Sequence, residues 1–116
     1  MSVTIYHNPR CSKSRQTLQI LQEKGIEPEV VKYLETPPTE EELRRIIRML
    51  GLSSARELMR RKEKEYRELG LDDPEKTEDE LIQAMVAHPR LIERPIVIRD
   101  GKAALGRPPE RVIDIL

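Results

Sequence analysis

The chain has 116 residues, within the usual size of one domain, so we expect a single domain over residues 1–116. Lysine plus arginine equals aspartate plus glutamate at 21 each, so no overall field draws the protein to nucleic acid or to an anionic membrane surface. No apolar stretch is long enough to cross a bilayer and no signal peptide precedes the first strand-like segment, so we expect a cytoplasmic protein.

The first third of the chain is typical of a strand, a helix and a second strand. Residues 3–6 are β-branched or aromatic, and residues 7–10 end this strand because they contain turn-forming asparagine and proline. Apolar residues at helical spacing from Ser12 onward predict a helix that ends at Gly25, and residues 29–33 predict the next strand. We therefore expect a βαβ unit with parallel strands and a right-handed crossover.

The middle of the chain has helical character. Three Ser/Thr-x-x-Glu capping boxes predict helix starts, at Thr39 with Glu42, Ser54 with Glu57, and Thr77 with Glu80. Between two helices with apolar stripes, a heavily charged helical stretch is expected over residues 55–69. We interpret residues 39–88 as a helical insertion packed beside the sheet and not as an independent domain.

The last part of the chain predicts a β-hairpin and a final helix. Residues 96–99 and 102–105 are strand-like and flank Asp100-Gly101, a favoured two-residue hairpin turn. The prolines at 108–109 suit a first helical turn, and apolar residues follow at helical spacing. The whole order of elements predicts an α/β fold, a thioredoxin-like mixed four-stranded sheet flanked by helices, with a helical insertion.

Cys11 is the single cysteine of the chain and falls at the junction of the first strand and helix. No internal disulfide is possible, and one cysteine with two histidines excludes a conventional structural zinc site, so we expect no metal. A helix N-terminus lowers the pKa of a thiol, and its amides together with Arg10, Lys13 and Arg15 would attract an oxyanion. The alternative is a small buried hydrophobic residue, which this polar, basic position disfavours.

The residues around Cys11 resemble a known active-site loop. Residues 7–15, His-Asn-Pro-Arg-Cys-Ser-Lys-Ser-Arg, are similar to the loop of arsenate reductases that use glutathione and glutaredoxin. The resemblance continues in the same order through residues 33–38, 68–71, 88–89, 93–97 and 106–108. It covers essentially the whole chain, which therefore resembles the glutaredoxin-coupled arsenate reductase family, the ArsC-like proteins of the thioredoxin-like superfamily.

The resemblance implies an oxidoreductase in which Cys11 attacks arsenate or a similar oxyanion. By their place in the matching motifs, Arg60, Arg94 and Arg107 would hold that oxyanion, and planar guanidinium groups suit the task. The local sequence alone indicates a different role for Arg60, as a solvated helix residue paired with a nearby glutamate. The resemblance also implies glutathione as co-substrate and a glutaredoxin partner, with no bound cofactor, so that electrons arrive by thiol exchange.

We assign roles to two further residues near the cysteine and a conformation to one proline. We interpret His7 as a nearby cation and Ser14, which matches the family's Cys-x-x-Ser spacing, as a hydroxyl donor, and both would stabilise the thiolate. The residues alone also allow structural roles, as a polar residue at a strand end and as a first-turn cap. Pro95 resembles the cis-proline of thioredoxin-like folds, although the residues alone predict a trans bond.

Two other functions are compatible with this fold. Transcriptional regulators of the Spx type share it and bind RNA polymerase, but they use a Cys-x-x-Cys switch and this chain has Ser14 at the second position. The other alternative is a general glutathione-dependent thiol oxidoreductase. Arg10, Ser12 and Lys13 differ from the smaller or less charged residues of the family's loop, which leaves the substrate and the rate open.

Overall fold

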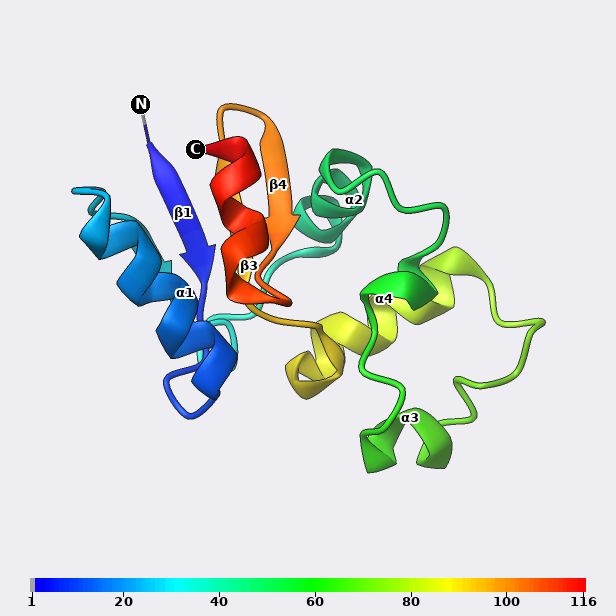
Figure 1. Cartoon of the computed structure of the whole chain (residues 1–116). Helices are drawn as coiled ribbons and strands as arrows, with labels where there is room; N and C mark the ends of the chain where they lie inside the picture. Colours follow the sequence, from blue (N-terminus) through cyan, green and yellow to red (C-terminus); the bar gives the residue numbers. More distant parts are fainter. Residues whose placement is uncertain (1) are drawn as a thin grey trace. The chain divides into compact units, whose positions relative to one another are not determined.

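The computed structural model describes residues 2–116, which form two compact units (Figure 1). The first unit contains the described chain up to Thr36 and again Arg94–Leu116, and the second unit is Pro37–Glu93. The second unit extends a few residues beyond the expected insertion at 39–88, whereas the single domain over 1–116 stays a prediction. Within residues 2–116, every helix is too short or too polar to cross a membrane.

In the described residues, the first unit is built on a mixed four-stranded sheet with the order β2-β1-β3-β4. Its strands are β1 (Val3–Tyr6), β2 (Glu29–Val31), β3 (Ile96–Arg99) and β4 (Lys102–Leu105). β1 and β2 are parallel, as the predicted βαβ unit requires, and the other two pairs are antiparallel. Asp100 and Gly101 have φ angles of 50° and 78°, which is the conformation of the predicted hairpin turn. The predicted fold class is confirmed.

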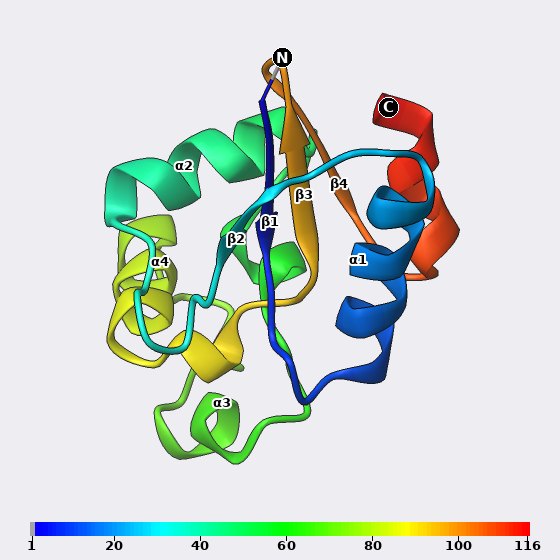
Figure 2. The same cartoon turned by 90° about the vertical axis from the view of Figure 1, so that its left-hand side faces the viewer.

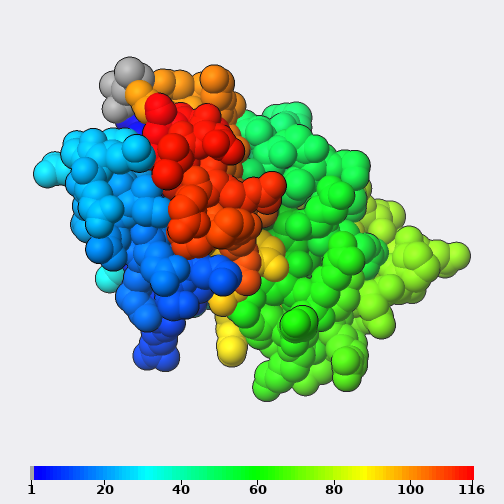
Figure 3. Space-filling model, viewed as in Figure 1, coloured from blue at the N-terminus to red at the C-terminus, as the bar shows by residue number. Residues whose placement is uncertain are grey.

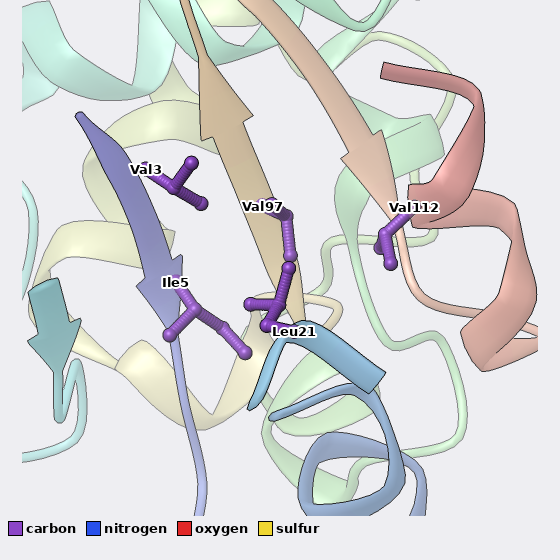
Figure 4. Packing of buried hydrophobic residues seen from close by; sticks show 5 residues of the cluster. All are labelled: Val3, Ile5, Leu21, Val97 and Val112. Carbon is purple, nitrogen blue, oxygen red and sulfur yellow. The ribbon is translucent and has the colours of Figure 1, made fainter. Parts of the chain in front are cut away.

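Two helices pack on one face of this sheet. Figure 2 shows α1 (Ser12–Glu23) and the C-terminal 3-10 helix η3 (Pro109–Ile115) on the same side, and Figure 3 shows their surfaces adjoining in blue and red. Between helices and strands lies a buried cluster of Val3, Ile5, Leu21, Val97 and Val112 (Figure 4). Truncating a fully buried leucine such as Leu21 costs about 2–5 kcal/mol of stability, so this cluster holds α1 firmly on the sheet.

The second unit consists mainly of short helices in the described residues. They are α2 (Glu40–Met49), η1 (Ala55–Leu58), α3 (Lys64–Glu68), α4 (Glu78–Ala87) and η2 (Pro89–Leu91), where η marks a 3-10 helix. All three predicted capping boxes are formed, so the predicted helix starts are confirmed. In a capping box, the two side chains satisfy backbone amides that the helix itself leaves free, which is why a local sequence signal suffices.

The prediction of one helical stretch over residues 55–69 is wrong. The 3-10 helix η1 ends at Leu58, and Met59 forms an antiparallel β-bridge with Ile92. Two backbone hydrogen bonds flank the bridge: Arg60 N–H donates to Leu91 O at 2.7 Å, and Glu93 N–H donates to Leu58 O at 2.8 Å. These contacts with a distant segment outweigh the local helix propensity, and helix resumes only at α3.

Candidate active site

Cys11 occupies the N-cap position of α1, directly after the loop that follows β1, and its side chain makes no capping hydrogen bond. Its backbone is extended (φ −94°, ψ 124°), its N–H donates to Asn8 O at 3.0 Å, and its carbonyl accepts from Arg15 N–H at 3.0 Å. The side chain is only partly buried. The first turn of α1 contains no acidic residue. The predicted position of the cysteine, at the junction of strand and helix, is therefore the observed one.

The surroundings of Cys11 favour its thiolate. Partial burial by itself raises the pKa of the thiol, because a charged sulfur loses water. The Ser14 amide, the positive charge and hydrogen bond of Arg94, and the Lys13 amide together more than offset this effect and lower the pKa below its ordinary value. Since the thiolate is the nucleophilic form of cysteine, Cys11 is suited to attack an electrophile.

Arg94 is the arginine that the structure brings to the cysteine. The charge of its guanidinium group, and to a smaller extent its capacity as a hydrogen-bond donor, lower the pKa of the Cys11 thiol. The Nε and Nη1 atoms of Arg94 are buried and lack a hydrogen-bond partner among the described residues. Arg94 therefore has donors to spare next to the reactive sulfur, as an anion site requires.

Arg107 lies beside Arg94 at the end of β4. Its Nη1 donates to the Arg94 carbonyl at 3.3 Å, and Gly106 N–H donates to Pro95 O at 3.0 Å. The Arg94–Pro95 peptide bond is cis, as the family resemblance implies, and the Arg107–Pro108 bond is also cis. The two arginines that the sequence places in separate segments are thus brought together by these contacts.

Gly106 makes this approach possible, a role that was not predicted from the sequence. A Cβ atom at Gly106 would lie 2.4 Å from Thr17 Oγ1 on α1 and 2.7 Å from Pro95 Cγ, well inside ordinary contact. Thr17 is fully buried, and its hydroxyl donates to Lys13 O at 2.8 Å. A glycine directly before a site arginine at a strand end is the sequence signal that indicates such a close approach.

His7 and Ser14 form a buried pair behind the loop. His7 Nδ1 lies 2.6 Å from Ser14 Oγ, which also accepts from Asn8 N–H at 3.1 Å. Burial first, and then the positive charges of Lys32 and Arg15, lower the pKa of His7, so its environment opposes the interpretation as a cation. Ser14 reaches the Cys11 sulfur through its backbone N–H. The pair therefore fixes the loop around the thiolate, and a direct stabilising role stays a prediction.

Arg60 belongs to the second unit, and its part in a common site with Cys11 stays a prediction. It lies outside any helix, in the segment between η1 and α3, so the interpretation as a solvated helix residue does not fit its backbone. Its guanidinium Nη1 is 2.6 Å from Glu63 Oε1, and the side chain is about one quarter exposed (28%). The predicted pairing of Arg60 with a nearby glutamate is therefore formed, and its partner is Glu63.

Within residues 2–116, no group of three or more histidine, cysteine, aspartate or glutamate side chains is placed to hold a metal ion. The geometry of the first unit defines a class of protein: a thioredoxin-like α/β sheet with an activated cysteine at a helix N-terminus, facing an arginine that precedes a cis-proline.

The chain belongs to the ArsC family, whose model matches residues 6–115. It is 60% identical to the uncharacterized protein YfgD of Escherichia coli K12, over 98% of this chain and 96% of that protein. It is 55% identical to an arsenate reductase of Neisseria meningitidis serogroup A, over 98% and 97% of the two chains. The solved structure of an arsenate reductase from Vibrio cholerae superposes with a TM-score of 0.98 at 57% identity, covering 100% of this chain and 98% of that one. The predicted resemblance to ArsC-like proteins is confirmed.

Proposed function

We propose that the protein is a cytoplasmic arsenate reductase in which the Cys11 thiolate attacks arsenate. In this proposal Arg94 and Arg107 hold the oxyanion and Arg60 completes its binding site. The names of two relatives support the substrate, because the Neisseria meningitidis and Vibrio cholerae proteins are both called arsenate reductases. The family match over residues 6–115 supports a shared chemistry.

The observation that carries the proposal is that two donor atoms of the Arg94 guanidinium group are buried without a hydrogen-bond partner among the described residues. A buried charged donor without a hydrogen bond is unfavourable, because it has lost water and gained no partner. The Nε and Nη1 atoms of Arg94 are in this state, while the same group acts on the Cys11 sulfur. An oxyanion bound there would accept hydrogen bonds from Arg94 and hold its central atom within reach of the thiolate.

The chemistry requires such donors. Arsenate carries negative charge that opposes an approaching thiolate, so attack needs fixed positive charge and amides that stabilise the charge redistributed in the transition state. The Cys11 thiolate forms a sulfur–arsenic bond, and one arsenate oxygen leaves as water after it has been protonated. Reduction of arsenic(V) to arsenic(III) then takes two electrons, which come from two thiols. Overall, one dihydrogen arsenate ion and two thiols yield one dihydrogen arsenite ion, one disulfide and one water.

The thiols come at least in part from outside the protein. Cys11 is the single cysteine of the chain, so no internal disulfide can form. Glutathione is the proposed co-substrate, and a glutaredoxin is the proposed partner that exchanges with the resulting disulfide. A cytoplasmic location suits this chemistry, because thiol pools are kept reduced there.

A coupled assay tests the proposal. Glutathione, glutathione reductase and a glutaredoxin are mixed with the protein, and the arsenate-dependent oxidation of NADPH is measured. The wild-type protein should show this rate and Cys11→Ser should show none, because the chain contains no second cysteine. Arg94→Ala should also lower this rate strongly. The matched control is Arg111→Ala, at an exposed arginine of η3, which should keep the wild-type rate. Reduction of a simple disulfide without any arsenate-dependent rate would instead indicate a general thiol oxidoreductase.

A further inference from the structure

A carboxylate in the second unit holds the guanidinium group of Arg60. Glu63 Oε1 lies 2.6 Å from Arg60 Nη1, and Glu63 Oε2 lies 3.9 Å from Arg90 Nη2. The Glu63 side chain is 15% exposed and that of Arg60 28%, whereas Arg90 is mostly in water at 63%. A charge-assisted hydrogen bond that is largely withdrawn from water is stronger than one on the surface. The Arg60–Glu63 pair is therefore the strong contact, and Arg90 makes only a longer, exposed ion pair with the same carboxylate.

Glu63 does not serve the helix that it precedes. It occupies the N-cap position of α3, where a side chain often accepts a hydrogen bond from an amide of the first turn. Glu63 makes no such bond. Its carboxylate points to arginines instead, although a helix as short as α3 would be stabilised by a cap. The orientation of Glu63 is therefore explained by Arg60 and not by its own helix.

The main chain of Arg60 is fixed as well. Its N–H donates to Leu91 O at 2.7 Å, and its carbonyl accepts from Glu63 N–H at 3.2 Å. The preceding residue, Met59, forms the β-bridge with Ile92. With the backbone held from both sides, the freedom that remains to Arg60 lies in its long side chain, which has many rotamers. Glu63 is the group that restricts these rotamers.

We propose that Glu63 is a positioning residue that presets the guanidinium group of Arg60 for the oxyanion. This inference rests on the proposed function, in which Arg60 contacts arsenate. A guanidinium group has five N–H donors in a fixed plane, and the contact of Glu63 with Nη1 leaves others available to a ligand. Donors that are oriented before the substrate arrives stabilise charge without reorganisation during the reaction. Glu63 thereby adds to the arsenate site without touching arsenate.

The test compares Glu63→Gln with Glu68→Gln, a matched change at an exposed glutamate of α3, the helix that Glu63 precedes. Glu63→Gln should lower kcat/KM for arsenate by about tenfold, since a full 1 Å misplacement of a positioning group costs about a hundredfold and glutamine still offers Arg60 an oxygen acceptor. The pH dependence of Cys11 alkylation and kcat/KM for the glutaredoxin should not change. Glu68→Gln should behave as wild type. An increase of kcat/KM for arsenate in Glu63→Gln would overturn the inference, because Glu63 would then compete with the oxyanion.

Two further measurements separate this inference from the proposed function. In an Arg60→Ala background, Glu63→Gln should have no additional effect, because Glu63 acts through Arg60. Without arsenate, ¹⁵N relaxation of the Arg60 Nε–H group should show an ordered side chain in wild type and a mobile one in Glu63→Gln. Equal order in both proteins, or an impaired Arg60→Ala beside a normal Glu63→Gln, would overturn the inference alone. Normal kinetics of Arg60→Ala would overturn the role of Arg60 in the proposed function and the inference with it.

Discussion

Replacing Gly106 by alanine should disturb the arginine site more than the fold. The backbone of Gly106 does not adopt the left-handed conformation that favours glycine, so the effect of an added methyl group is steric. The new Cβ atom would lie 2.4 Å from Thr17 Oγ1 and 2.7 Å from Pro95 Cγ, against an ordinary contact of 3.4 Å or more. Segments must therefore move apart by about 1 Å, the difference between 3.4 and 2.4 Å.

The displacement caused by the alanine side chain should occur mainly in the two segments that contain Arg94 and Arg107. Thr17 is fully buried and its hydroxyl is bonded to Lys13 O, so α1 yields little. Gly106 is directly followed by Arg107, and Pro95 directly follows Arg94. Overpacking of this kind costs about 1–3 kcal/mol of stability. A displacement of 1 Å in a substrate-positioning group lowers the rate on the order of a hundredfold.

The assay measures kcat/KM for arsenate and the free energy of unfolding by urea for Gly106→Ala, Thr17→Ala and the double variant. Gly106→Ala should remain folded with a strongly reduced kcat/KM. The double variant should recover part of this loss, because the nearest clashing atom, Thr17 Oγ1, has been removed. Unchanged kinetics and stability in Gly106→Ala would show that the end of β4 adapts freely, and that the close approach does not position Arg107.

The charge states of two groups and the role of the arginines are open to direct measurement. The pH profile of Cys11 alkylation should have its midpoint below that of free cysteine measured in the same buffer, because the Ser14 amide and Arg94 lower the pKa of the thiol. Arg94→Ala should move this midpoint upward. An identical midpoint in both proteins would contradict the role of Arg94. Alanine at Arg94 or Arg107 should reduce kcat/KM on the order of a hundredfold, and Arg94→Lys should also be impaired because lysine lacks the planar fork. Near-normal kinetics in both alanine variants would mean that these arginines do not bind the oxyanion. His7 should titrate by NMR below its ordinary value of about 6.5, since burial and neighbouring cations lower its pKa. As the pH drops, His7 is protonated in the unfolded chain before it is protonated in the folded one. The free energy of unfolding should therefore fall between about pH 6.5 and the lower folded-state pKa of His7, and His7→Gln should lack this loss. An NMR titration midpoint of His7 at or above 6.5 would refute the conclusion that its surroundings lower its pKa.

The elements that the sequence predicts correctly depend on near neighbours. Thr39 with Glu42 and Thr77 with Glu80 satisfy amides within a single helical turn, so each helix start is encoded in four residues. The Asp100-Gly101 turn is equally local, because these two residues tolerate the positive φ that the hairpin needs. The position of Cys11 follows from the same kind of signal, a strand that ends in a turn before a helix begins.

By itself, the sequence determined the order of elements, the single reactive cysteine and its place at a helix N-terminus, since these depend on local patterns and on composition. The tertiary structure decided what lies close to that cysteine. The effect of the Arg94 charge on the Cys11 thiol and the fit of Gly106 against Thr17 join segments far apart in the chain, and no local pattern encodes such contacts. The same reason explains the error over residues 55–69, where pairing of Met59 with Ile92 overrode local helix propensity. The same reason explains why the structure opposes the interpretation of His7 as a cation. The pKa of His7 depends on its burial and on the charges that folding brings near it.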